Sequence, residues 1–266
     1  MLAVCATPIG NLEDVTLRVL AMLRDVDVVL AEDTRHTRGL LERHGIRATL
    51  VSYHEHNEAA RTAELVPRLV AGEKMALVSD AGMPGISDPG LRLIRAARDA
   101  GVVVTVLPGP SAVETALVAS GLGTGSYAFV GFLPRRAGEL AALWRDSAGW
   151  GMPLVAFESP KRIGKALESL ASIDAARPVA VCRELTKRFE EVARGTAVEL
   201  ASAFAADVRG EITVVVGAGE AARVDEADAH DAVRALIAAG ASRRTAADVV
   251  ARLTDLSKND LYDASL

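Results

Sequence analysis

Residues 79–90 read Ser-Asp-Ala-Gly-Met-Pro-Gly-Ile-Ser-Asp-Pro-Gly, and this stretch decides the fold. It follows a short apolar run, 75–78, which is typical of a buried strand, and it precedes residues 91–100, whose apolar spacing predicts a helix. Asp88 before Pro89 has the form of a helix N-cap followed by the first helical residue. The stretch is therefore a strand-to-helix loop whose three glycines let a ligand approach the backbone. Open α/β sheets bind ligands at such loops.

The first 108 residues alternate between strand and helix signals. Strands are expected at 2–6, 26–31, 48–52, 75–78 and 102–107. Helices are expected at 15–23, around Leu40 and Leu41, at 59–70 and at 91–100. This alternation predicts a parallel sheet, so the polar loops that follow the strands should all lie along one edge.

The segment Pro108-Gly109-Pro110-Ser111 marks a domain boundary, and Ser111 with Glu114 fits a helix capping box. We expect an α/β fold with an N-terminal domain at 1–108, a second α/β domain at 109–222 and a small helical tail at 223–266. Strands of the second half are expected at 128–130, 154–157, 179–182, 189–193 and 212–216. The strand at 189–193 follows the strand at 179–182 too closely for a regular crossover, which predicts a mixed sheet.

Composition limits the possible classes of protein. The chain has 266 residues, of which 50% are hydrophobic and 4% aromatic, and its formal net charge is −5. An acidic chain has no bulk attraction for nucleic acid, so any such site must be a local basic patch. Cys5 and Cys182 fall in expected strands and should be buried, reduced thiols. No signal peptide or membrane span is recognisable, which predicts a soluble, cytoplasmic protein.

Common ligand motifs are missing from the glycine-rich loops. None matches the dinucleotide fingerprint, the phosphate-binding loop of NTPases or the hydrolase nucleophile elbow. His54 and His56 flank Glu55, but no further histidine or cysteine cluster supports a metal, so none is expected. Acidic residues do follow the expected strands, and carboxylates there suit ribose hydroxyls. They are Asp33, Asp80, Asp88, Glu158, Glu184 and Glu211. These features predict a nucleoside-like ligand between the two domains.

Seven motifs in one order carry a family resemblance. They are ATPIGNL (6–12), EDTR (32–35), YHEHN (53–57), the stretch at 79–90, PGPSA (108–112), FESPKR (157–162) and RELTK (183–187). Together they resemble the bacterial ribosomal RNA small subunit methyltransferase I family of the tetrapyrrole-methylase-like superfamily, over nearly the whole chain.

The resemblance implies S-adenosylmethionine (SAM) as methyl donor, bound in the cleft between the domains. It also implies a homodimer that methylates the ribose 2′-oxygen of cytidine 1402 in 16S rRNA, either free or in the assembled small subunit. Carried over position by position, the implied cofactor contacts are Pro8, Asp80, Gly82, Met83, Ser111, Ala112, Phe157, Leu185 and Glu211.

Roles in catalysis and RNA binding are hypotheses with simpler alternatives. Asp33 would accept or orient the proton of the 2′-hydroxyl, but an ion pair with Arg35 explains it equally well. Candidate RNA contacts are Arg35, His54, His56, Lys161, Arg162, Lys187, Arg243 and Arg244. The last two lie in the tail, which could be a helix-turn-helix-like RNA contact or simply packed helices.

Two rival functions stay open at this stage. One is a precorrin or diphthine-type methyltransferase of the same superfamily. The other is a SAM-binding RNA assembly factor without turnover, which methyl incorporation would distinguish from an enzyme.

Overall fold

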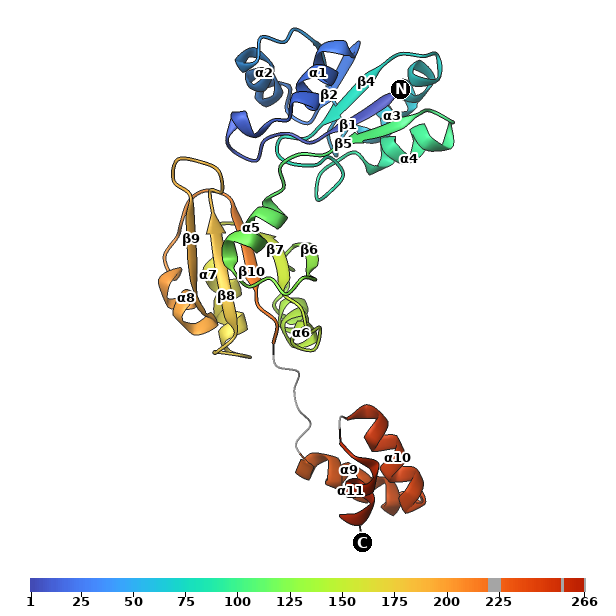
Figure 1. Cartoon of the computed structure of the whole chain (residues 1–266), viewed down its shortest axis with the longest axis vertical. Coiled ribbons are helices and arrows are strands. Elements are labelled where there is room, and N and C mark those ends of the chain that lie inside the picture. Colours follow the sequence, from blue (N-terminus) through green and yellow to red (C-terminus); the bar gives the residue numbers. More distant parts are fainter. Residues whose placement is uncertain (220–225, 255, 266) are drawn as a thin grey trace.

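The computed structural model describes residues 1–219, 226–254 and 256–265. In this part of the chain, two five-stranded sheets follow one another, and three C-terminal helices come after them (Figure 1).

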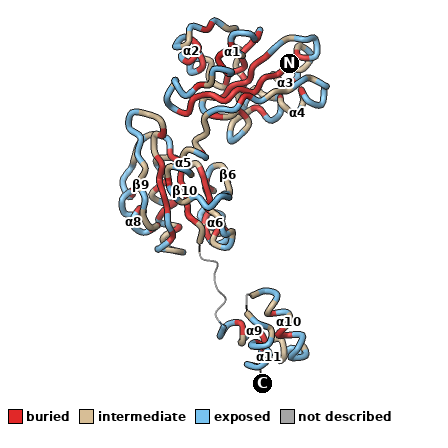
Figure 2. Tube along the Cα trace, viewed as in Figure 1, coloured by how far each residue is buried: buried red, intermediate tan, exposed pale blue. Residues whose placement is uncertain are grey.

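The first sheet is parallel and has a fully apolar centre. Its strands are β1 (Leu2–Cys5), β2 (Val28–Ala31), β3 (Thr49–Ser52), β4 (Met75–Val78) and β5 (Val104–Leu107). They pair in the order β3-β2-β4-β1-β5, and every pairing is parallel. Strands β1, β2 and β4 are buried at each position because helices cover both faces, as the continuous apolar runs predict (Figure 2). The predicted parallel sheet is confirmed.

Amphipathic helices cover the first sheet on its two faces. Helices α1 (Leu17–Asp25) and α2 (Thr34–Arg43) pack on one face, where a short 3-10 turn, η1 (Leu12–Asp14), leads into α1. Helices α3 (Glu58–Val70) and α4 (Leu91–Asp99) pack on the other face. The loops between each strand and the next helix therefore meet at the carboxyl edge of the sheet.

The second sheet is mixed, as predicted. Its strands are β6 (Ala128–Phe132), β7 (Leu154–Glu158), β8 (Pro178–Arg183), β9 (Glu191–Thr196) and β10 (Ile212–Val216), in the order β6-β7-β10-β8-β9. Only β6 and β7 are parallel among these pairs. Helix α5 (Ala112–Ser120) packs on one face, and α6 (Ala137–Ala148), α7 (Ile163–Ala171) and α8 (Ala197–Ala203) pack on the other.

The C-terminal helices have an apolar core of their own. They are α9 (Glu226–Ala238), α10 (Arg243–Leu253) and α11 (Lys258–Asp263). Buried alanine, valine and leucine side chains join them, and the Ser242 hydroxyl caps α10 by accepting from the Thr245 amide at 3.2 Å. The expected domain boundary at 108/109 falls between β5 and α5 and stays a prediction. The boundary at 222/223 lies outside the described residues.

Two predicted helix caps are wrong, although α4 begins at Leu91 as expected. Helix α4 begins at Leu91 behind Gly90, which has φ 142°, so Asp88 and Pro89 remain in the loop instead of capping the helix. At α5, the Ser111 hydroxyl donates to the Glu114 carboxylate, and no side-chain cap bond to the backbone forms. In both places a polar side chain that suits a cap takes part in other interactions.

Candidate active site

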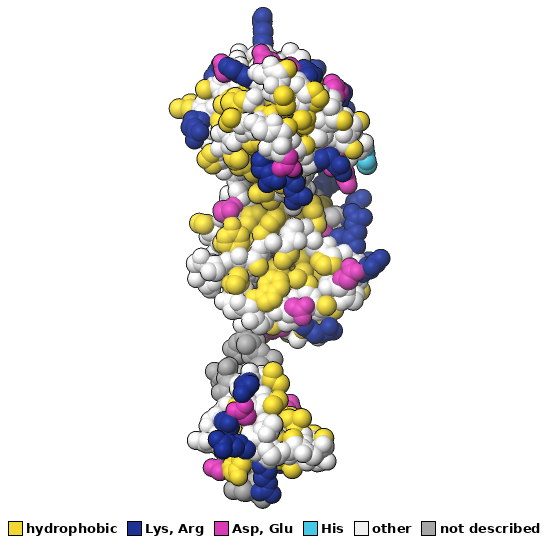
Figure 3. Space-filling view, turned by 90° about the vertical axis from the view of Figure 1, so that its right-hand side faces the viewer, with side chains coloured by type: hydrophobic (Ala, Val, Ile, Leu, Met, Phe, Trp, Pro, Cys, Tyr) yellow, Lys and Arg dark blue, Asp and Glu magenta, His cyan; other side chains and the backbone are white. Residues whose placement is uncertain are grey.

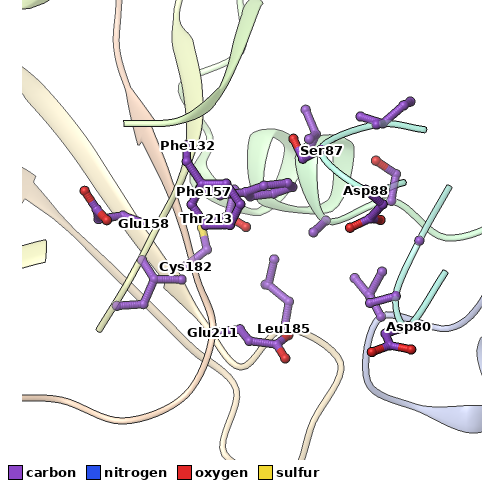
Figure 4. Close-up of a pocket in the computed structure, with 18 of the residues that line it drawn as sticks. Asp80, Ser87, Asp88, Phe132, Phe157, Glu158, Cys182, Leu185, Glu211 and Thr213 are labelled. Atoms are coloured by element: carbon purple, nitrogen blue, oxygen red, sulfur yellow. The ribbon is translucent and has the colours of Figure 1, made fainter. Parts of the chain in front are cut away.

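A cavity of about 430 Å³ opens where the two sheets face each other. The first half of the chain lines it with loops that follow β1, β2 and β4, including Glu32 and residues 80–88. The second half lines it with the start of α5, the end of β7, the loop after β8 and the start of β10. Figure 4 shows Asp80, Ser87 and Asp88 on one wall and Phe157, Thr213 and Leu185 on the other. The volume suits a ligand of nucleoside size or larger.

Backbone hydrogen bonds hold the loops after β1 and β4 together. Thr7 and Gly82 exchange two bonds of 2.9 and 3.1 Å, and the Thr7 hydroxyl donates to the Ser79 carbonyl at 3.0 Å. Gly82 has φ 74°, a left-handed conformation that glycine adopts without strain. The residue types of both motifs thus determine where Asp80 lies.

Within the described residues, three non-glycine residues have left-handed backbones: one lines the cavity, and the other two flank Leu185, which lines it from the other side. They are Ser87 (φ 65°), Glu184 (φ 53°) and Thr186 (φ 65°). Each costs about 1–3 kcal/mol in backbone strain, which persists only where the surrounding structure imposes it. Such strain is typical of functional sites, and here it occurs on both walls.

The structure brings together eight of the nine residues expected to contact a cofactor. Around the cavity lie Asp80, Gly82, Met83, Ser111, Ala112, Phe157, Leu185 and Glu211. Pro8 lines a neighbouring cavity of about 250 Å³, which adjoins the first at Asp80 and Glu211. Their role as cofactor contacts stays a prediction, but their convergence is what a shared ligand requires.

Asp33 is engaged by its neighbour Arg35. Its carboxylate accepts from the Arg35 amide at 2.8 Å and thereby caps α2, and it also accepts from the Arg35 guanidinium at 3.1 and 2.7 Å. These bonds hold the pKa of Asp33 well below its usual range. A carboxylate so stabilised is a weak proton acceptor. The geometry is that of the ion pair, and the catalytic role of Asp33 stays a hypothesis.

The remaining candidates in the loops differ in accessibility. His54 Nε2 lies 3.1 Å from the Asn57 amide, while its buried Nδ1 has no hydrogen-bond partner among the described residues. His56 is exposed, with its ring 6.0 Å from that of His54. Within residues 1–219, 226–254 and 256–265, no three His, Cys, Asp or Glu side chains gather as a metal site.

Of the two basic candidates at 161–162, one already has partners within the protein and the other is exposed. Helix α7 begins at Ile163, directly after Lys161 and Arg162. Arg162 donates to the Pro134 carbonyl at 2.7 Å and lies 3.2 Å from the buried Glu158 carboxylate, whereas Lys161 is exposed.

The other basic candidates also divide into a side chain held in ion pairs and side chains exposed to solvent. Lys187 bridges Glu184 and Glu211 at 2.9 and 3.1 Å. Arg243 and Arg244 are exposed at the start of α10, in the tail.

Two carboxylates of the cavity wall have no role of their own in the hypotheses drawn from the sequence. Burial, followed by the charge of Asp80, raises the pKa of Glu32. Burial and the charge of Glu32 raise the pKa of Asp88 to about 6. Asp88 is among the acidic loop residues expected near a ligand. Glu32 is not, although it could have been found because it directly precedes Asp33 at the end of β2. The sequence could not show that the two meet.

Comparison with known families defines the class of protein to which this fold and cavity belong, the tetrapyrrole-type methylases. Residues 1–201 match the profile of the family described as Tetrapyrrole (Corrin/Porphyrin) Methylases. Among solved structures, the methyltransferase CobJ superposes with a TM-score of 0.63 at 20% identity, over 82% of this chain and 93% of that one. A diphthine synthase gives 0.62 at 16%, over 81% and 89%. At these identities the likeness shows the fold alone.

Closer relatives define the family within this class. A ribosomal RNA small subunit methyltransferase I from Halalkalibacterium halodurans is 42% identical over 97% of this chain and 92% of its own length. The protein of that name from Mesorhizobium japonicum is 44% identical over 97% and 88%. Residues 223–266 match the profile described as RsmI C-terminal HTH domain. The chain therefore belongs to the ribosomal RNA small subunit methyltransferase I family.

Proposed function

We propose that this chain transfers the methyl group of SAM to the ribose 2′-oxygen of cytidine 1402 in 16S rRNA. The observation that carries the proposal is the 42–44% identity to small subunit rRNA methyltransferases over nearly the whole chain, together with the cavity at the predicted cofactor residues. A related fold, the uroporphyrin-III C-methyl transferase of Thermus thermophilus, was solved with S-adenyl homocysteine and superposes with a TM-score of 0.57 at 20% identity, over 84% of this chain and 99% of that one.

The cavity fits SAM in its chemistry as well as in its size. Asp80 and Glu211 offer carboxylates to hydroxyl and ammonium groups, and Phe157 and Leu185 offer apolar surface to an aromatic base. When bound, SAM supplies a methyl group on a sulfonium, whose departure as a neutral thioether needs no acid. The protein must hold the ribose oxygen behind that methyl group, and such alignment can recover roughly 7–11 kcal/mol of the barrier.

RNA recognition falls to exposed basic side chains, because the chain as a whole is acidic. We assign this role to Lys161, near the cavity, and to Arg243 and Arg244 at the start of α10. A helix-turn-helix places the start of its second helix against nucleic acid, which supports the assignment to the tail. With a net charge of −5, an assembled subunit whose shape adds recognition is the better substrate than free rRNA. Action in the cytoplasm, where such subunits are found, belongs to the same proposal.

A homodimer is the second part of the proposal. Large apolar side chains are exposed near edge strand β5, with Val103 just before the strand and Val106 on it. On helix α5, the side chain of Val118 is 81% exposed. Figure 3 shows hydrophobic side chains gathered on one face of the molecule. Exposed apolar surface of this kind is typical of protein–protein contacts. Light scattering after gel filtration should give twice the monomer mass.

The experiment that tests the reaction uses labelled SAM. Small subunits that lack the modification, and naked 16S rRNA in parallel, are incubated with the protein, and the product is mapped by primer extension at low nucleotide concentration. We expect a single stop at cytidine 1402 and preference for the particle. Absence of incorporation, with SAM binding intact, would contradict the proposal and redirect attention to tetrapyrrole or diphthine-type substrates or to a binding function.

A further inference from the structure

Asp88 lies on the cavity wall that faces the aromatic side. It is half-buried in the loop between β4 and α4, and it lines the cavity together with Ser87 and Asp80. Figure 4 shows its carboxylate across the cavity from Phe157 and Thr213. A group in this position can reach a substrate that approaches a ligand held between the two walls.

The backbone around Asp88 is built to keep it there. Gly85, Ser87 and Gly90 have φ values of 84°, 65° and 142°, so the chain leaves the usual helical and extended regions on both sides of Asp88. A Cβ on Gly90 would lie 2.9 Å from the Leu77 Cδ2 atom, which shows how closely the loop packs on β4. Because Ser87 has a side chain, its left-handed backbone is strained, and the strain maintains the direction of the next residue.

The charges around Asp88 distinguish it from the other carboxylates. Glu32 at the end of β2 and Asp80 at the end of β4 face it on its own wall, with the Ser79 hydroxyl as a hydrogen-bond donor. His54 and Glu55, after β3, lie near Glu32.

The opposite wall carries further carboxylates, Glu158 and Glu211. Arg162 lies 3.2 Å from Glu158, and Lys187 lies 3.1 Å from Glu211. These two cations therefore pair with carboxylates of the opposite wall, whereas the charged groups that act on Asp88 among the described residues, Glu32 and Asp80, are acidic.

The alternatives for a proton acceptor are less suitable. Asp33 is neutralised by Arg35. One oxygen of Asp80 accepts from the Asp33 amide at 3.0 Å and so holds the β2 and β4 loops together. Among the described residues, no cation acts on Asp88. Burial, followed by the charge of Glu32, raises its pKa to about 6, although the hydrogen bond from the Ser79 hydroxyl acts in the opposite direction. A carboxylate with a pKa just below the working pH is ionised and still accepts a proton readily.

We propose that Asp88 is the general base of the reaction and removes the proton from the ribose 2′-hydroxyl. The inference rests on the proposed 2′-O-methylation. As the bond between the 2′-oxygen and the methyl carbon forms, the bond from that carbon to sulfur breaks and its electron pair stays on sulfur. The hydroxyl proton passes to a carboxylate oxygen of Asp88 and is then lost to solvent.

The test is a single-turnover measurement of methyl transfer between pH 5 and 8 with SAM and small subunits in excess over their dissociation constants. For the unmodified protein, the rate constant should rise about tenfold per pH unit and level off at or below pH 6, since a sulfonium nearby favours the ionised carboxylate. Asp88→Asn should lower the rate constant at its high-pH plateau by about 10²- to 10⁴-fold and abolish the break in the pH profile, that is, the pH at which the rate levels off. Asp88→Glu should restore part of the rate together with a break.

Matched controls keep the result interpretable. Asp146→Asn, an exposed acidic residue on α6, should leave rate and pH profile unchanged. Calorimetry should give a SAM affinity for Asp88→Asn within about threefold of the original, which also reports correct folding.

Three outcomes would overturn the inference: an unaltered pH break in Asp88→Asn, a loss of SAM affinity that accounts for its lower rate, or removal of the break by Glu32→Gln alone. Failure of the unmodified protein to methylate rRNA is a different result, because it contradicts the proposed function instead.

Discussion

Asp33 and Asp88 are the same residue type in the same region of the fold, but their surroundings shift their pKa values in opposite directions. Both belong to loops at the carboxyl edge of the first sheet. Asp33 has a guanidinium on both oxygens, which lowers its pKa, whereas Asp88 is half-buried beside Glu32, which raises its pKa to about 6. The first is therefore suited to holding α2 and Arg35 in place, and the second is suited to exchanging a proton at neutral pH.

The two cysteines give a prediction at the same scale. Both are buried, as expected from the sequence, and burial raises the pKa of Cys5 to about 12 and that of Cys182 to about 11. Since only the thiolate reacts, and an ordinary thiol has a pKa of about 8.5, both should react with Ellman's reagent at pH 8 at least about 100-fold more slowly than an exposed thiol.

The control for this measurement is Ser202→Cys, an exposed position on α8 that should react at once. Unfolding in guanidinium should then release two equivalents of thiol from the unmodified protein. Rapid labelling of Cys182 in the folded state would show that the cavity wall at this position opens to solvent.

The loop between β4 and α4 is the element that links the fold to the site. It starts at the buried Ser79, meets the β1 loop through Thr7 and Gly82, and ends at Gly90 before α4. Its glycines are required by positive φ at Gly82, Gly85 and Gly90 and by close packing at the last. The proline-and-glycine composition that predicts a loop is thus also what shapes the cavity wall.

Substitution at Gly90 tests the role of this element in stability. Gly90→Ala should lower the free energy of unfolding by about 1–3 kcal/mol, because the new Cβ would be strained at φ 142° and would meet Leu77. Gly39→Ala is the matched control: it lies inside α2 with open space around its Cβ, and should stabilise the protein by about 0.5–1 kcal/mol. Urea unfolding measures both. Equal midpoints for the two variants would mean that the loop conformation is not required.

The whole molecule combines two sheets that form the cavity with a tail that has its own core. Within the described residues, no helix is long and apolar enough to span a membrane. Loops from both sheets also meet directly, since the Asn11 amide donates to the Thr186 hydroxyl at 3.0 Å. Residues from both sheets line the cavity, and we expect the tail to add RNA contacts without altering its walls.

Neutralising two arginines of the tail separates these contributions. Arg243→Gln with Arg244→Gln should leave the SAM affinity unchanged, raise KM for the small subunit several-fold, and reduce the slope of log affinity against log salt by about 1 to 2. Arg234→Gln is the control, because Arg234 on α9 already pairs with Asp231. An unchanged salt slope in the double variant would contradict RNA binding by this end of α10.

The sequence by itself determined the order of strands and helices, the parallel and mixed character of the two sheets, and the residues that gather around the cavity. The elements and the sheet types follow from local signals: apolar runs, their spacing, and glycine and proline at the turns. The residues of the cavity follow instead from the family resemblance, whose motifs carry them over position by position. The tertiary structure decided the state of each charged group, because that state depends on partners distant in the chain. Asp80 meets the Asp33 amide 47 residues away, Glu32 meets Asp88, and Lys187 is held by Glu211. It also decided what precedes α4: Asp88 lines the cavity instead of capping the helix, and Gly90, with φ 142°, occupies the cap position.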